Sequence, residues 1–405
     1  MELEKIQLPF KIDIPVLGLG SQVKNRACFA KGRFAYLSAL HQNLNDPRDF
    51  LNFQKSVKYF LKKKPRLIAH DLHPEYQSTK YIQNLSAKRY RLYAIQHHHA
   101  HIASCMLDNE LKNQEVIGVA FDGTGLGIDG KIWGAEFLLC NYRNFKRRAH
   151  LKEIPLLGQE QAILEPWRLA AIWLYFAYGD RFMNLDINFI KKIDKKKWKV
   201  LKHMYSAGFN SPLASSMGRL FDAVASLVLG KFKVSFEAEL AMALEEKVTK
   251  SQSHKVSAQA SPKGARSVRK PPRRGQSQCA TLPEGGKVTR YHFDIVKDKE
   301  YIIDPAPMFK DIVRELKAGR KKEEIAYSFH ATVASMIRKV CLIIRQESRI
   351  NKVVLSGGVF QNKVLLGLSL DLLYREGFQV FGHREIPCND SGISLGQAVI
   401  AYCRS

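Results

Sequence analysis

Residues 115–140 read EVIGVAFDGTGLGIDGKIWGAEFLLC and carry the strongest indication of the fold. An apolar run is followed by a turn rich in glycine and then by a second apolar run, a pattern that predicts a β-hairpin. Backbone N–H groups at its tip can approach an anion such as phosphate, because little side-chain bulk is present at Asp122, Gly123, Thr124 and Gly125. The alternative interpretation is a glycine-rich hairpin without a ligand.

A second glycine turn occurs near the C-terminus. The stretch INKVVLSGGVFQNKVLLGLSLDLLYREG predicts a short strand, a turn at Ser356, Gly357 and Gly358, and an amphipathic helix. A strand that leads through glycines into a helix N-terminus suits the phosphate or ribose of a nucleotide. A further strand then leads to a loop with Asn389 and Asp390 before the last helix. Asp390 could instead serve only as the cap of that helix.

Strands and helices alternate in two successive halves, which predicts an N-terminal lobe over residues 1–112 and a C-terminal lobe over residues 113–405. Hairpin phosphate loops in an α/β chain favour a bilobal, actin-like ATPase fold of two related lobes, with mixed sheets flanked by helices. A Rossmann fold is disfavoured, since no G-x-G-x-x-G motif follows a first strand. Residues 249–288 are rich in Ser, Pro, Gly and basic side chains, and we expect a disordered insertion there.

The 405 residues carry a net charge of +26, which could indicate a polyanionic partner. About +8 of this charge lies in the insertion, with nine Lys or Arg and one Glu, so nucleic-acid binding is disfavoured. The seven cysteines form no C-x-x-C pair, which argues against a zinc ribbon. No apolar run is long enough to span a membrane, and the first residues lack the features of a signal peptide. We therefore expect a cytoplasmic protein without a membrane partner.

The stretch YRLYAIQHHHAHIASCML holds four of the 13 histidines. In a helix, His97 and His101 lie one turn apart on the same face, which is a common spacing for metal ligands. Carboxylates or cysteines from elsewhere in the chain would have to complete such a site. Otherwise the segment could be a polar patch or a set of buried rings.

Seven motifs occur in this sequence in the same order as in a known family. They are HDLHPEYQSTKY, QHHHAHIAS, GVAFDGTGLGIDGKIWGAEF, EPWRLA, SSMGRLFDAVASLVLG, VVLSGGVFQN and NDSGISLGQAVIA. The chain resembles the C-terminal carbamoyltransferase region of the HypF family of hydrogenase maturation proteins, which is related to the threonylcarbamoyl-adenosine synthesis proteins. The resemblance covers residues 17–402 apart from the basic insertion.

The resemblance implies a divalent metal, iron or zinc, held by His97, His101, Asp122 and Asp390. It also implies binding of ATP, AMP or carbamoyl adenylate by Gly123, Thr124, Gly218, Asp222, Gly357, Gly358 and Asn362. Asp222 would reach the ribose. His99 and His73 are expected as catalytic contacts that handle substrate or protons, with a structural role as the alternative.

The implied reaction transfers a carbamoyl group from carbamoyl adenylate to the C-terminal cysteine thiol of a HypE-like partner, for the cyanide ligand of nickel-iron hydrogenase. Motifs of the family's acylphosphatase and adenylate-forming domains do not occur in this sequence, so we expect the isolated transferase part and a separate protein that forms carbamoyl adenylate. Threonylcarbamoyl transfer to tRNA and a degenerate nucleotide-binding scaffold are the alternatives.

The sequence departs from the family pattern at several positions. Gln159 and Ala238 stand where the family has glycine in its GGD and Tyr-Glu-Gly-Gln stretches, and Ser391 replaces a glycine of the last loop. Asn43 stands where the family has an aspartate. These changes predict weaker nucleotide binding but leave the four metal-ligand positions intact.

Overall fold

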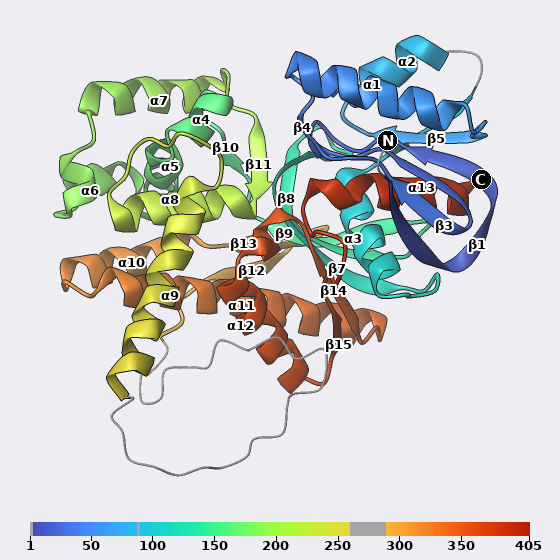
Figure 1. The fold of residues 1–405 in the computed structure, drawn as a ribbon. Coiled ribbons are helices and arrows are strands. Elements are labelled where there is room, and N and C mark those ends of the chain that lie inside the picture. Colours follow the sequence, from blue (N-terminus) through green and yellow to red (C-terminus); the bar gives the residue numbers. More distant parts are fainter. Residues whose placement is uncertain (1–2, 87–89, 260–288) are drawn as a thin grey trace.

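The computed structural model describes residues 3–86, 90–259 and 289–405, which form two α/β lobes (Figure 1). The N-terminal lobe is built on a four-stranded mixed sheet with the order β3-β1-β5-β6. The first two strands pair antiparallel, and β5 and β6 follow in parallel. The bounds are β1 (Glu4–Gly18), β3 (Cys28–Leu37), β5 (Leu67–Asp71) and β6 (Arg91–Ile95), with the small pair β2 (Val23–Asn25) and β4 (His41–Asn43).

The C-terminal lobe contains a larger sheet with the main order β12-β13-β9-β8-β7-β14-β15. An antiparallel pair, β7 and β8, is again followed by two parallel strands, β14 and β15. This shared order is the relationship between lobes that the sequence predicts. The bounds are β7 (Val116–Leu126), β8 (Ile132–Cys140), β9 (Phe145–Leu151), β10 (Ile154–Pro155), β11 (Leu213–Ser216), β12 (Asp294–Lys297), β13 (Tyr301–Asp304), β14 (Lys352–Ser356) and β15 (Gln379–Phe381).

Helices cover both sheets (Figure 1). The N-terminal lobe has α1 (Pro47–Leu61) and α2 (Gln77–Ser86). The C-terminal lobe has α4 (Glu160–Leu164), α5 (Trp167–Tyr178), α6 (Asn188–Lys191), α7 (Lys195–Ala207), α8 (Met217–Leu229), α9 (Glu239–Gln259), α10 (Ala306–Lys317), α11 (Lys322–Ser348) and α12 (Lys363–Arg375), with the 3-10 turns η1 (Gly179–Asn184), η2 (Gly358–Gln361) and η3 (Asp390–Gly392).

The disordered insertion predicted from residue 249 begins later than expected, because α9 continues to residue 259. Residues 249–259 are helical, whereas disorder was predicted from residue 249. This segment contains neither proline nor glycine, and extension of an existing helix adds one hydrogen bond per residue, so its polar composition does not prevent helix formation. The rest of the predicted insertion, residues 260–288, lies outside the described residues.

Two further helices, α3 (His97–Asp108) and α13 (Ile393–Arg404), pack against each other between the two sheets. Each crosses to the other lobe: α3 follows β6 but packs on β7 and β14, whereas α13 follows β15 but packs on β1 and β5. Backbone contact is close, since a Cβ atom at Gly396 would lie 2.0 Å from the carbonyl oxygen of Ala100. The predicted division of the chain into two lobes at residue 112 stays a prediction. Apolar residues of α13, at the C-terminus, belong to the same hydrophobic core as residues of the N-terminal sheet.

No helix within the described ranges is both long and apolar enough to cross a lipid bilayer.

Candidate functional site

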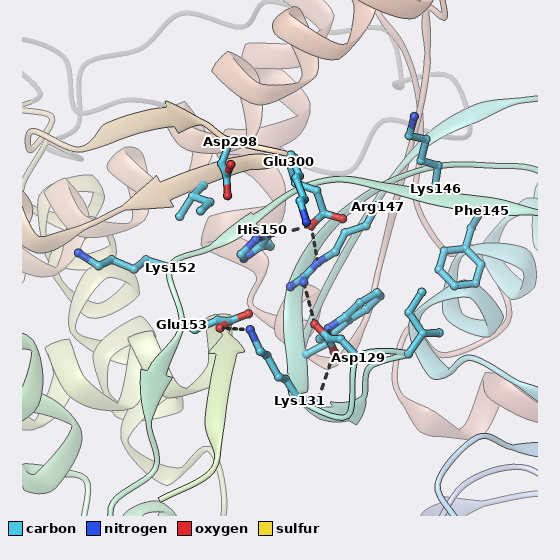
Figure 2. Close-up of a pocket in the computed structure, with 14 residues that line it drawn as sticks. Asp129, Lys131, Phe145, Lys146, Arg147, His150, Lys152, Glu153, Asp298 and Glu300 are labelled. Atoms are coloured by element: carbon cyan, nitrogen blue, oxygen red, sulfur yellow. Dashed lines mark hydrogen bonds and ion pairs between the residues drawn. The ribbon is translucent and has the colours of Figure 1, made fainter. Parts of the chain in front are cut away.

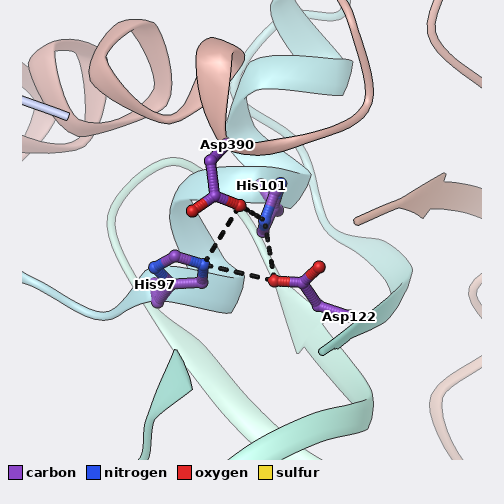
Figure 3. Close-up of side chains that lie close together, drawn as sticks. All are labelled: His97, His101, Asp122 and Asp390. Carbon is purple, nitrogen blue, oxygen red and sulfur yellow. Dashed lines mark ion pairs between the residues drawn. The ribbon is translucent and has the colours of Figure 1, made fainter. Parts of the chain in front are cut away.

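Four side chains from three separate segments converge between the lobes (Figure 3). His97 and His101 come from the first two turns of α3, Asp122 from β7 and Asp390 from η3. Each offers one ligand atom, and these atoms all lie within 4.8 Å of one another. We call these residues the quartet, and they are the four metal ligands implied by the sequence resemblance.

The spacing within the quartet fits a shared cation. His97 Nε2 lies 3.4 Å from Asp122 Oδ2 and 3.8 Å from Asp390 Oδ1, and His101 Nε2 lies 3.5 and 3.6 Å from the same atoms. Four ligands about 2.1 Å from one ion in a tetrahedral arrangement would be about 3.4 Å apart. Both Nε2 atoms are buried without a hydrogen-bond partner, so a metal ion would satisfy them.

Asp71, at the end of β5, orients one imidazole of the quartet. His97 Nδ1 donates a hydrogen bond to Asp71 Oδ2 over 2.8 Å, which leaves Nε2 directed toward the carboxylates. Burial lowers the pKa of His97, but Asp71, Asp390 and Asp122 outweigh it and hold this pKa well above the ordinary value. The sequence motif includes Asp71, but no spacing rule connects it to His97.

The glycine turn after β14 holds the second oxygen of Asp122. Gly358 N donates a hydrogen bond to Asp122 Oδ1 over 3.0 Å. The preceding residue, Gly357, has φ +104°, and a Cβ atom there would lie 2.2 Å from the carbonyl oxygen of Phe121. Only glycine fits this close approach, and Asp122 is thereby fixed with its Oδ2 directed toward the imidazoles.

The predicted nucleotide-binding residues fall into two groups. Gly123 and Gly218 lie against each other beside Asp122, since a Cβ atom at Gly218 would be 3.0 Å from the Gly123 Cα, and the half-buried Thr124 follows in β7. Asn362 instead caps α12, where its Oδ1 accepts a hydrogen bond from Leu365 N over 2.8 Å. Its amide nitrogen contacts His330 Nε2, so the Asn362 side chain is already engaged.

Arg219 lies next to the predicted ribose contact and was not identified from the sequence. Its guanidinium is buried, with Nε 3.0 Å from Asp222 Oδ2 and Nη2 donating to Glu237 Oε1 over 2.9 Å. The third nitrogen, Nη1, is buried without a partner. Burial raises the pKa of Asp222 to about 6. A buried guanidinium with an unpaired N–H group, close to Gly123, is suited to a ligand with an anionic oxygen.

The two predicted catalytic histidines have different surroundings. His99 points away from the quartet: its Nε2 donates to the Asn141 carbonyl over 2.6 Å, and its ring packs on Phe145. The expected substrate contact of His99 is not supported by this placement, because a residue two positions after His97 lies on the opposite side of the helix. The backbone N–H of His73 donates to Asp71 Oδ1, which places this residue next to the quartet.

The tautomer of His73 limits its possible role. Its Nδ1 accepts a hydrogen bond from Glu75 N over 3.2 Å, so in the neutral ring the proton is on Nε2. The ring stacks flat on Tyr76, with centroids 4.3 Å apart. Burial lowers the pKa of His73, although Asp71 acts in the opposite direction. His73 can therefore donate a hydrogen bond but is not arranged to remove a proton.

A separate cavity of about 770 Å³ lies beside the β7–β8 turn, β9 and β13 (Figure 2). Several of its charged side chains pair with each other, as in Lys131–Glu153 at 2.6 Å and Arg147–Glu300 at 3.4 Å. None of the predicted site residues lines it. The chemistry proposed below belongs to the quartet and not to this cavity.

The departures from the family pattern differ in their structural effect. Gln159 and Ala238 have φ values of +52° and +68°, so the backbone keeps the glycine conformation although the residues have changed. Ser391 instead lies within the turn η3, where its N–H and hydroxyl both contact Asn389 Oδ1, without positive φ. Asn43 Oδ1 accepts a hydrogen bond from Asn45 N in a surface turn.

Two family models match the chain. The model described as "HypF Kae1-like domain" matches residues 11–108, and the one described as "Carbamoyltransferase, Kae1-like Domain, second subdomain" matches residues 118–272 and 277–397. Among curated proteins, the carbamoyltransferase HypF of Synechocystis sp. is 32% identical over 97% of this chain and 48% of its own length. The carbamoyltransferase HypF homolog of Cupriavidus necator is 32% identical over 96% of this chain and 91% of its own length.

Solved structures agree with these matches. A crystal structure of full-length HypF in a phosphate- and nucleotide-bound form superposes with a TM-score of 0.84 at 34% identity, over 98% of this chain and 47% of that one. HypF of T. kodakarensis gives a TM-score of 0.80 at 26% identity, over 98% of this chain and 48% of that one. The chain thus spans about half the length of the first curated relatives that it matches, and the predicted bilobal α/β fold is confirmed. The chain belongs to the HypF carbamoyltransferase family.

Proposed function

We propose that this chain is a metal-dependent carbamoyltransferase of hydrogenase maturation, which moves a carbamoyl group from carbamoyl adenylate to the C-terminal cysteine thiol of a HypE-like partner. The observation that supports this function most strongly is the quartet, with two unpartnered imidazole nitrogens beside the glycine turns, in a chain of the HypF family. Nucleotide binding is supported by the phosphate- and nucleotide-bound relative.

The quartet would hold the metal, and its mixed nitrogen and oxygen donors suit iron or zinc. Such an ion, when bound, supplies polarisation of a carbonyl or phosphate oxygen. Gly123 and Gly218 pack closely against each other next to Asp122, and Arg219 Nη1 offers its free N–H to an anionic oxygen of the adenylate. Asp71 keeps His97 in the orientation required for metal binding.

In the proposed reaction the thiol loses its proton to water, and the thiolate sulfur attacks the carbamoyl carbon. A carbon–sulfur bond forms, the bond from carbon to the phosphate oxygen breaks, and AMP leaves with that electron pair. The chain's own cysteine nearest the quartet in sequence is poorly suited as nucleophile, since burial raises the pKa of Cys388 to about 11.

The test combines the purified chain with a HypE-like protein and carbamoyl adenylate, and examines the partner's terminal cysteine by mass spectrometry. We expect carbamoylation with the wild-type chain and with Asp298→Asn, a charge-matched control in the separate cavity, but not with Asp390→Asn. An unmodified cysteine in every reaction would contradict the proposal. The net charge of +26 makes tRNA threonylcarbamoylation the second candidate, and modification of tRNA by the same chain would favour it.

A further inference from the structure

Three buried polar residues lie close together between the segments that carry the quartet. His383 Nε2 is hydrogen-bonded to Ser356 Oγ at 2.8 Å, whereas His383 Nδ1 lies 3.5 Å from Asp108 Oδ2 without a hydrogen bond. Ser356 is fully buried, and the side chains of His383 and Asp108 are 7% and 4% exposed. None of the three belongs to the quartet or to the predicted nucleotide contacts.

Asp108 joins the end of α3 to the loop that delivers Asp390. It is the last residue of the helix, and its carboxylate accepts hydrogen bonds from the backbone N–H groups of Arg384 at 2.6 Å and Ile386 at 3.3 Å. The next residue, Asn109, donates from its side chain to the carbonyl oxygen of Gly382 over 2.8 Å. The helix that carries the imidazoles therefore holds residues 382–386 in place.

Ser356 joins the same loop to His101 and to the glycine turn. The Ser356 hydroxyl lies 3.0 Å from the backbone carbonyl of His101. A carbonyl oxygen can only accept, so Ser356 gives its single proton to His101, and His383 Nε2–H donates to the serine oxygen. In the neutral ring Nδ1 then carries no proton, so Asp108 acts on this loop through the backbone N–H groups of Arg384 and Ile386 and not through the His383 ring. Two residues further along, Gly358 N holds Asp122 Oδ1. His383 is thus in contact with the strand end that fixes both His101 and Asp122.

The Ser–His–Asp order is also found in hydrolase active sites, but this serine cannot act as a nucleophile toward a substrate. Its oxygen is fully buried, and its proton is given to a main-chain carbonyl. We propose instead that Ser356, His383 and Asp108 form a positioning brace that sets the distance of Asp390 from His101 and Asp122. This inference rests on the proposed metal centre, because its role is to keep four ligands at coordinating distance before the cation binds.

The test is a cobalt titration of the folded apoprotein, in which the visible absorption of bound Co²⁺ reports the coordination geometry. Ser356→Ala and His383→Gln leave all four ligands in place. We expect each variant to bind one equivalent of Co²⁺ with about 10- to 100-fold weaker affinity and a shifted absorption band. Circular dichroism shows whether each variant folds. If His383→Gln does not fold, the cobalt titration of Ser356→Ala, which lacks only one oxygen atom, still tests the proposal.

The control is His41→Gln. His41 is also buried, in β4 of the N-terminal lobe, and its Nε2 lies 3.5 Å from the hydroxyl of Ser56 and contacts none of the quartet. Loss of this pair should lower stability without changing cobalt affinity or the spectrum. Variants of Ser356 and His383 that bind Co²⁺ like the wild type would overturn the brace alone. A wild-type protein that binds no Co²⁺ would overturn the metal centre as well.

Discussion

The direction of each histidine in the HHHAH segment follows from its position on one helix. His97 and His101 are four residues apart and face the carboxylates, whereas His99 lies between them in sequence and faces Asn141. Helical spacing alone therefore separates ligands from packing residues. The Gln96 side chain, which accepts a hydrogen bond from His99 N, fixes where this helix begins and thus the rotation of every ring on it.

His101→Ala should remove the bound metal while the protein stays folded, because the variant loses one of four ligands and only one buried ring. His99→Ala is the matched control on the same helix and should lower stability but keep the metal. Metal analysis and circular dichroism of both variants check this expectation. Equal metal content in the two proteins would contradict the ligand assignment.

Asp222 should make stability depend on pH. Burial raises its pKa from 3.8 to about 6, so the folded state binds the proton more tightly than the unfolded state does. The stabilisation is complete below about pH 4 and is lost as pH rises through 6, which amounts to about 3 kcal/mol. Asp222→Asn should therefore gain stability relative to the wild type as pH increases from 4 to 8 in urea unfolding experiments. If the difference in unfolding free energy between the variant and the wild type did not change with pH, the Asp222 carboxyl would not be the source of the pH dependence.

Individual residues also mark how far the sequence can predict the site. The quartet could be predicted because imidazole spacing and family motifs both point to it. Asp71 and Arg219 could not be assigned, since their roles depend on distances between segments that no local pattern encodes. The family resemblance implied a substrate contact for His99, with a structural role as the alternative, whereas the helical period places this ring on the side away from the quartet.

At the scale of elements, the backbone in two loops keeps a conformation that suits glycine better than the residues present. Ala238, just before α9, has φ +68°, and a left-handed conformation costs a residue with a Cβ atom about 1 to 2 kcal/mol. The loop also carries Glu237, which accepts a hydrogen bond from Arg219. The contact is therefore maintained against local strain.

Ala238→Gly should raise the free energy of unfolding by about 0.5 to 1 kcal/mol, because relief of strain exceeds the added entropy of the unfolded chain. Ala318→Gly is the control, since this exposed residue has φ −75° and should only lose stability. The midpoints of urea unfolding compare the two. If both variants were destabilised, the positive φ of Ala238 would carry no strain.

At the scale of the whole molecule, the two lobes are interlocked by their last helices. The hairpin of β7 and β8 and the strand, glycine turn and helix of β14 and α12 could be predicted from the sequence, since such units have local signatures. The crossing of α3 and α13 has no local signature in the sequence, because it depends on contacts between residues about 300 positions apart. Asp390 reaches the imidazoles only because α13 returns to the N-terminal sheet.

Gly396→Ala should disturb both lobes together. The added methyl would lie 2.0 Å from the Ala100 carbonyl oxygen, between the turns that carry His97 and His101, so the helices must separate. We expect a loss of about 3 kcal/mol in stability and weaker metal binding. Thermal unfolding with and without metal measures both effects, and an unchanged melting temperature would show that the contact is loose.

The crossed helices also restrict how the protein can move during turnover. A wide hinge opening would pull the backbone of α13 away from that of α3 at Gly396, because each lobe carries a helix that lies on the other. Sliding of the two helices along each other keeps that contact. Substrate access is then expected through small shear displacements and through rearrangement of the outer loops, and not through separation of the lobes.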